Sequence, residues 1–225
     1  MYKCILIFAA HPDDEITMGG TIAKLASGGA EVIVVQMTDG CEGYKKPEDK
    51  SRIVKIRKKE AHNCDRILGI KKRVFLNYPD MSGTYDRESY QKCIQLIRKY
   101  RPEAIFTHGP GALNRDHIAV YKNTREAIWQ ASEPVSGALG QPHLTKAVYF
   151  YKDYAQRGPF VVLDVSNFAE KRVQAYESQK SQRDLVRKSY REAKSGALLV
   201  KETGEKYFER FELAYFYHFH NFINL

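Results

Sequence analysis

The sequence has 225 residues, 43% of them hydrophobic and 28% charged, which excludes an intrinsically disordered chain and suits one domain over residues 1–225. Four scattered cysteines exclude a disulfide scaffold, and the apolar run at residues 4–10 is too short for a membrane span and lacks a signal-peptide cleavage site. We therefore expect a cytoplasmic protein, whose formal net charge of +9 leaves an anionic partner open.

Apolar runs alternate with amphipathic segments along the chain. In chain order we predict a strand at 4–10, a helix at 19–26, a strand at 31–37, a helix at 51–68, a strand at 74–76, a helix at 90–100, a strand at 104–107, a helix at 117–131, strands at 147–151 and 161–165, and a helix at 168–194. This order is typical of an α/β fold, a Rossmann-like three-layer arrangement with helices on both faces of a mostly parallel sheet. Because ligands bind at the carboxyl ends of such strands, we expect the site within residues 11–15, 38–43, 77–83 and 108–117.

The turn after the first predicted strand is acidic rather than glycine-rich. It reads A-H-P-D-D-E at residues 10–15, and its three acids would repel the phosphates of a nucleotide. His11 and Asp14 supply a nitrogen and an oxygen that suit a divalent metal such as zinc, and Asp13 between them is free to face a metal-bound water. The alternative is that Asp13 and Asp14 only cap the next helix, which would leave the histidine unexplained.

A catalytic zinc usually has three protein ligands and one open position, so a third ligand is expected from another strand end. His117 follows the strand predicted at 104–107 and opens a helix, which makes it the best candidate. Asp116 beside it could orient a ligating histidine. A lone histidine is more often structural, but two candidate metal loops at one edge of the sheet favour the ligand.

These motifs resemble those of the PIG-L/LmbE-type zinc-dependent N-deacetylase family, which removes acyl groups from N-acetylated sugars and related amides. The resemblance spans roughly residues 4–179 in the family's order. It comprises A-H-P-D-D-E at 10–15 with Gly19-Gly20, T-D-G at 38–40 with Glu42-Gly43, Arg57, Glu60 and Ala61 with Leu68-Gly69, Leu76 to Asp80, D-H-x-x-V at 116–120, and Lys171, Ala175 and Ser178-Gln179. The first motif is the most specific of these.

The resemblance implies that His11, Asp14 and His117 hold Zn²⁺, although another divalent transition metal would suit the same ligands. It also implies that Asp13 is the general base that assists attack of zinc-bound water on the N-acetyl group of an N-acetylglucosamine-type sugar or sugar conjugate. The expected partner is therefore a small N-acylated sugar, with no nucleic acid and no membrane span.

One motif departs from the family pattern. The best-known family form of the late motif reads H-x-D-H, and Asn114 stands in the place of its first histidine. An asparagine can donate a hydrogen bond to an oxyanion but cannot deliver a proton. The leaving amine would then take its proton from Asp13, or from His108 if the loop at 109–113 folds back.

Further polar residues lie in the segments predicted near the mouth of the site. Arg57 is one of them, although it could instead pair only with Glu60, at helical spacing from it. We assign these residues to substrate binding or to the layer behind the ligands: Arg57, Asp80, Arg115, Asp116 and Glu15.

Two other functions remain open from the sequence. A catalytically degenerate relative would bind metal without hydrolysing a substrate, which Asn114 allows. A nucleic-acid-binding module would use the basic stretches at 45–59 and 180–201, but both also contain acids and read as solvated helix faces. The aromatic residues at 207–222 predict either core packing or a homo-oligomer interface.

Overall fold

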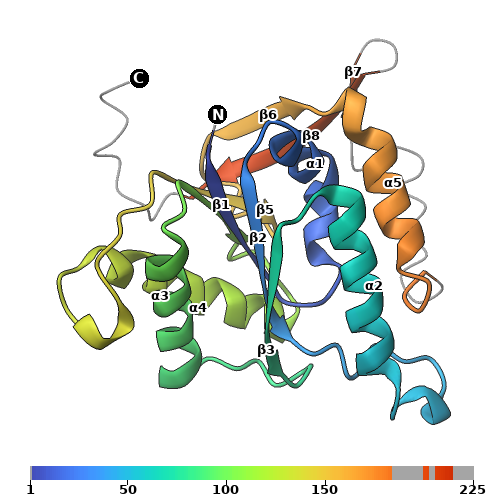
Figure 1. The fold of residues 1–225 in the computed structure, drawn as a ribbon, viewed down its shortest axis with the longest axis horizontal. Helices are drawn as coiled ribbons and strands as arrows, with labels where there is room; N and C mark the ends of the chain where they lie inside the picture. The colour runs from blue at the N-terminus through green and yellow to red at the C-terminus, as the bar shows by residue number, and fades with distance from the viewer. Residues whose placement is uncertain (1, 184–199, 203–205, 215–225) are drawn as a thin grey trace.

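The structure is a computed structural model that describes residues 2–183, 200–202 and 206–214. Strands and helices alternate through most of this range (Figure 1). The strands are β1 Cys4–Ala9, β2 Glu31–Thr38, β3 Lys72–Tyr78, β4 Ala104–His108, β5 Ala147–Lys152, β6 Phe160–Asp164, β7 Val200–Glu202 and β8 Lys206–Leu213. The helices are α1 Gly19–Ser27, α2 Ile53–Leu68, α3 Arg87–Tyr100, α4 Arg115–Ser132 and α5 Ala169–Ser178, with short 3₁₀ turns η1 Asp14–Met18, η2 Pro47–Asp49, η3 Gly137–Leu139 and η4 Ser166–Phe168.

In the described part of the chain the strands form one sheet in the order β3-β2-β1-β4-β5-β8-β6, with β7 paired to β8. Strands β1 to β5 pair in parallel, and β8 runs antiparallel to its neighbours. The prediction of a Rossmann-like, mostly parallel sheet is therefore confirmed. Strand β1 lies inside the sheet, between β2 and β4, and its run of apolar residues is buried on both faces.

Helices cover both faces of the sheet (Figure 1). Side chains on one face of β1, such as Ile5 and Ile7, join a core under α1, α2 and α5. The alternate side chains, such as Leu6 and Phe8, join a second core under α3 and α4. Among the helices described here, none is long and apolar enough to cross a membrane.

The helix ends that differ most from prediction are the start of α3 and the end of α5. Helix α3 begins at Arg87 because the Asp86 carboxylate accepts a hydrogen bond from the Ser89 amide at 2.8 Å and caps the helix. The helix predicted at 168–194 ends at Ser178, where the Glu60 carboxylate accepts hydrogen bonds from the Ser181 backbone and hydroxyl at 2.8 and 2.6 Å. The rest of that prediction, from 184 onward, lies outside the described residues.

The structure describes only the first part of the aromatic segment at 207–222. Its first part lies in β8, where Phe211 packs into the core with an exposed fraction of 4%, as expected for core packing. The sequence pattern does not identify this segment as a strand. Residues 215–222 lie outside the described part of the chain.

A charged cluster is buried directly beneath the first turn. Arg73 of β3 donates to Glu15 at 2.5 Å and to Asp65 at 2.7 Å, and the side chains of Arg73 and Glu15 have no solvent exposure. Removing one partner of a buried ion pair leaves the other charge unpaired in a medium of low polarity. Glu15 therefore supports the fold under the site.

We expect Arg73→Ala to lower the free energy of unfolding by about 3–5 kcal/mol, because two buried carboxylates lose their counter-ion. Urea denaturation followed by circular dichroism measures this change. Arg52→Ala is the matched control, since Arg52 forms a solvent-exposed pair with Asp49 and should change stability little. Equal effects of the two substitutions would contradict the expectation.

Candidate metal centre

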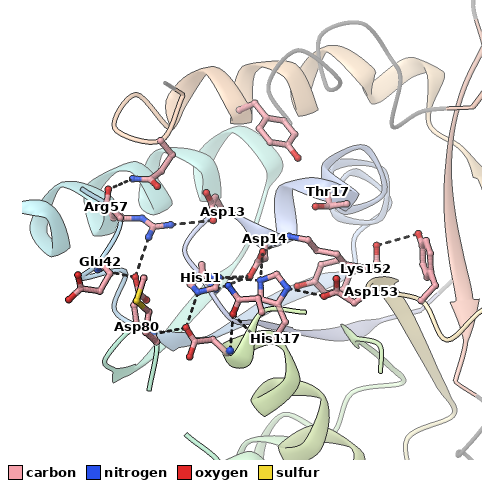
Figure 2. A pocket seen from close by; sticks show the side chains of 18 of the residues that line it. His11, Asp13, Asp14, Thr17, Glu42, Arg57, Asp80, His117, Lys152 and Asp153 are labelled. Atoms are coloured by element: carbon pink, nitrogen blue, oxygen red, sulfur yellow. Dashed lines mark hydrogen bonds and ion pairs between the residues drawn. The ribbon is translucent and has the colours of Figure 1, made fainter. Parts of the chain in front are cut away.

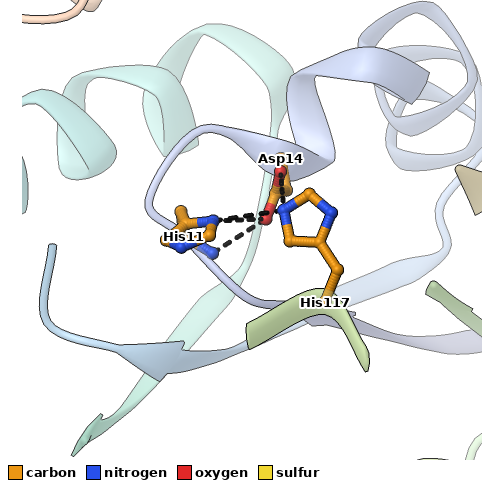
Figure 3. Close-up of side chains that lie close together, drawn as sticks. All are labelled: His11, Asp14 and His117. Carbon is orange, nitrogen blue, oxygen red and sulfur yellow. Dashed lines mark hydrogen bonds and ion pairs between the residues drawn. The ribbon is translucent and has the colours of Figure 1, made fainter. Parts of the chain in front are cut away.

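The three predicted metal ligands meet at the carboxyl edge of the sheet (Figure 3). His117 Nε2 lies 3.2 Å from His11 Nδ1 and 3.5 Å from Asp14 Oδ1, and His11 Nδ1 lies 3.4 Å from Asp14 Oδ2. A tetrahedral zinc with bonds of about 2.0–2.2 Å separates its ligand atoms by about 3.4 Å. Two imidazole nitrogens and one carboxylate at these distances fit a divalent metal ion.

Local hydrogen bonds bring these side chains to the edge. The turn after β1 is closed by the Asp13 amide, which donates to the His11 carbonyl at 2.8 Å, while the His11 amide donates to the Asp14 carboxylate at 2.8 Å. Asn114 caps α4 by accepting hydrogen bonds from the Asp116 and His117 amides at 2.8 and 3.4 Å. His117 is thereby held in the first turn of α4.

Each candidate histidine ligand also contacts a carboxylate other than Asp14, through the ring nitrogen that faces away from the other ligands. His11 Nε2 lies 3.2 Å from Asp116 Oδ2, a contact of the kind that a residue orienting this ring would make. Burial alone would lower the pKa of His11, but its hydrogen bonds to the Asp116 and Asp14 carboxylates raise it to about 10. Asp116 is held by the Met81 and Gly83 amides, which donate to it at 2.7 and 2.8 Å. A metal ion at this position therefore competes with a proton on His11.

Two further charged residues, both from the end of β5, contact the ligands. Lys152 Nζ lies 2.7 Å from Asp14 Oδ1, and Asp153 Oδ2 lies 2.9 Å from His117 Nδ1. Burial raises the pKa of Asp14, but the charges of Lys152 and His117 outweigh it and hold that pKa well below its usual range. Neither Lys152 nor Asp153 is among the residues predicted from the sequence, although both follow directly on the strand predicted at 147–151, where the strand-end rule would have placed them.

Asp13 points to the other side of the turn. Its Oδ1 accepts a hydrogen bond from Arg57 Nη2 at 3.2 Å, and Arg57 Nη1 lies 3.7 Å from Asp80 Oδ2. Glu60 instead holds Ser181, so the interpretation that Arg57 pairs only with Glu60 is wrong. The buried Arg57 therefore orients Asp13 beside the candidate ligands.

Two glycines make room for this arginine. A Cβ atom at Gly40, where φ is +78°, would lie 2.9 Å from the Arg57 side chain, and one at Gly43 would lie 2.6 Å from Arg57 Nη1. Asp80 fixes the same loop by accepting hydrogen bonds from the Gly40 and Glu42 amides at 3.0 and 3.1 Å. The glycine of the T-D-G motif therefore leaves the space that the Arg57 side chain occupies.

The candidate ligands, together with Asp13 and Arg57, line one cavity of about 700 Å³ (Figure 2). Its wall includes the three candidate ligands, Asp13 and Arg57, with Tyr176 and Phe211 on the side of α5 and β8. Acidic residues outnumber Lys and Arg in this wall, although the whole chain carries a net charge of +9. The excess positive charge therefore lies mainly outside the cavity.

Comparison with known proteins shows which family this chain belongs to. The family model described as PIG-L, GlcNAc-PI de-N-acetylase, matches residues 6–128. This chain belongs to the PIG-L family. The diacetylchitobiose deacetylase of Thermococcus kodakarensis is 31% identical over 194 residues, which cover 80% of this chain and 70% of that protein. The 1D-myo-inositol 2-acetamido-2-deoxy-alpha-D-glucopyranoside deacetylase of Rhodococcus jostii is 31% identical over 175 residues, which cover 65% of this chain and 60% of that one.

A solved structure agrees with this assignment. The N,N'-diacetylchitobiose deacetylase from Pyrococcus horikoshii, complexed with its inhibitor MPG, superposes with a TM-score of 0.84 and 29% sequence identity. The superposition covers 97% of this chain and 86% of that structure. The chain thus matches the PIG-L family model and shares the fold of a solved deacetylase.

The remaining predicted residues of this PIG-L family protein lie in different surroundings. Asn114 lines the cavity, and because its Oδ1 caps α4, its NH₂ group is the end left to face a ligand. Arg115 is exposed and is not among the residues that line the cavity. Glu15 belongs to the buried cluster under the turn.

His108 is fully buried and also is not among the lining residues. Its Nδ1 lies 2.7 Å from Asp153 Oδ2, and its Nε2 lies 3.1 Å from the Tyr151 hydroxyl. The loop at 109–113 packs against the end of β5, where the Gly109 amide donates to the Lys152 carbonyl at 2.9 Å. This position favours a role behind the ligands over proton delivery to a substrate.

Proposed function

We propose that this chain is a zinc-dependent N-deacetylase that removes the acetyl group from an N-acetylglucosamine-type sugar or sugar conjugate. The observation that carries the proposal is the set of His11, Asp14 and His117 ligand atoms 3.2 to 3.5 Å apart, next to Asp13, in the wall of one cavity. The named activities of the Thermococcus and Rhodococcus relatives support this substrate class.

His11, Asp14 and His117 would hold the Zn²⁺ ion. When bound, the ion would supply Lewis acidity that activates water and polarises the amide carbonyl. Asp13 accepts the proton of the attacking water, and Arg57 keeps the Asp13 carboxylate aimed at the cavity through the 3.2 Å contact. Asp13 then returns this proton to the leaving amine, because His108 has no place in the cavity wall.

Asn114 stabilises the oxyanion that forms as water adds to the carbonyl. Its amide NH₂ group is the donor, and the helix cap fixes its orientation. The acidic excess in the cavity wall favours a neutral sugar over an anionic one, since a phosphate or carboxylate would be repelled there.

We expect Asn114→Asp to lower kcat by about 10²–10³-fold while metal content stays unchanged, because the variant lacks the amide donor. Aspartate also caps helices well, so α4 should keep its stability and the effect on activity can be read separately. Asn114→His, which restores the family's H-x-D-H form, is the comparison that should keep substantial activity. Full activity of Asn114→Asp would contradict this role.

The proposal is tested by metal analysis of the purified protein together with amine release from a panel of N-acetylated sugars, sugar conjugates and small amides. We expect about one zinc ion for each chain and release of amine from at least one N-acetylglucosamine derivative. Bound zinc without release from any member would indicate the catalytically degenerate relative. Absence of bound metal under all conditions would overturn the proposed centre.

A further inference from the structure

One carboxylate contacts two histidines beneath the cavity. Asp153 Oδ2 lies 2.9 Å from His117 Nδ1 and 2.7 Å from His108 Nδ1. The Asp153 side chain has an exposed fraction of 18%, and the residue lines the cavity. His117 is the candidate metal ligand among these three residues, and its Nε2 faces the other ligands. Asp153 contacts the opposite side of the same ring (Figure 2).

Asp153 is held in place independently of His117. Its backbone has a φ of +55°, a conformation that aspartate tolerates better than most residues. The Gly111 amide donates to the Asp153 carbonyl at 3.0 Å, and a Cβ atom at Gly109 would lie 2.2 Å from that same carbonyl oxygen. The glycine-containing loop after β4 therefore packs backbone to backbone against the end of β5 and fixes the position of the carboxylate.

His108 contacts the Asp153 carboxylate from the interior of the protein. It is fully buried, and while its Nδ1 contacts Asp153, its Nε2 lies 3.1 Å from the Tyr151 hydroxyl. Both ring nitrogens of His108 thus contact residues at the end of β5. This arrangement explains why a histidine stands at the end of β4 without lining the cavity.

The contact with Asp153 determines which nitrogen of His117 carries a proton. A neutral imidazole has one N–H group, and a carboxylate accepts a hydrogen bond but does not donate one. Asp153 Oδ2 lies 2.9 Å from His117 Nδ1, whereas the other carboxylate near the ring, Asp14, lies farther away, with Oδ1 3.5 Å from Nε2. The proton of neutral His117 is therefore on Nδ1, which leaves the lone pair of Nε2 directed toward His11 and Asp14.

We propose that Asp153 is a positioning residue that holds His117 in the tautomer and orientation required for metal binding through Nε2, and that His108 holds Asp153. The proposal rests on the metal centre described under the proposed function. It adds that the end of β5 supplies the carboxylate for His117, as the first turn of α4 supplies Asp116 for His11.

The first test needs neither metal nor activity. Proton–nitrogen correlation NMR on the metal-free, full-length protein at mildly alkaline pH should show His117 with its proton on Nδ1. In Asp153→Asn this preference should be reduced, because an amide can turn its NH₂ group toward the ring. A wild-type His117 protonated on Nε2, or an unchanged tautomer in Asp153→Asn, would overturn the proposal.

The second test is zinc affinity measured by competition with a chelator. We expect Asp153→Asn to weaken zinc binding about 10–100-fold, as for other carboxylates that orient a metal-binding histidine. Asp164→Asn is the matched control, because Asp164 is exposed at the end of β6 and should leave affinity unchanged. Affinity of Asp153→Asn within about twofold of the wild type, well short of that expected loss, would count against the proposal, even in a protein that proves to have no deacetylase activity.

Discussion

Replacing Asp13 with asparagine is expected to lower kcat for amine release by about 10²–10⁴-fold, the usual contribution of a general base, while bound zinc stays unchanged. Asparagine keeps the size of the side chain but cannot accept the proton of the attacking water. Asp13 is free for this role because Arg57, and not a candidate metal ligand, is its observed partner, at 3.2 Å. Steady-state kinetics and metal analysis of the same preparation measure both quantities.

The control for Asp13→Asn is Asp49→Asn, at a surface position where the carboxylate contacts only the exposed Arg52 among the pairs described. Its kcat should match that of the wild type. A loss of zinc in Asp13→Asn would mean that this carboxylate belongs to the ligand set. Unchanged kcat with full zinc content would mean that another group serves as the base.

Replacing His117 with alanine is expected to remove zinc and reduce amine release to the background rate, because only His11 and Asp14 would remain as ligands. Removal of metal from the wild type with a chelator should have the same effect and should be reversed by added zinc. Because a ligand that binds only the folded state stabilises it, added zinc should also raise the Tm of the metal-free wild type but not that of His117→Ala.

His62→Ala provides the matched histidine control, since the His62 side chain is exposed on α2 with an exposed fraction of 59%. Zinc content, activity and the response of Tm to zinc should all be retained in this variant. If His117→Ala kept its full zinc content, the ligand set proposed here would be incorrect. If it lost activity but kept zinc, His117 would act on the substrate instead.

Much of the site could be predicted because its residues follow strands in an alternating chain. Buried apolar runs identify strands, their order predicts a parallel sheet, and the ends of parallel strands meet at one edge. The order of the elements therefore predicts that His11, Asp14 and His117 lie near one another. It does not predict which neighbours each side chain contacts, since several partners at one edge have similar chemistry.

Two residues at the end of β5 illustrate this limit. Lys152 and Asp153 have no motif of their own, and only the pairing of β4 with β5 brings them under the candidate centre. Strand β8 is not predicted, because its aromatic residues would suit a buried helix or a buried strand equally well. Its antiparallel pairing with β5 and β6 joins residues that are far apart in the sequence. The early end of α5 depends on Glu60, a residue far away in sequence.

The sequence alone determines the fold class, the family resemblance and the chemical identity of the candidate ligands, because periodicity and short motifs are local properties. Tertiary structure decided that Arg57 contacts Asp13, that His108 lies behind the ligands, and that the cavity wall is acidic in a chain with a net charge of +9. These features depend on which strand ends and loops pack together. Such packing is set by the whole core and cannot be read from neighbouring residues.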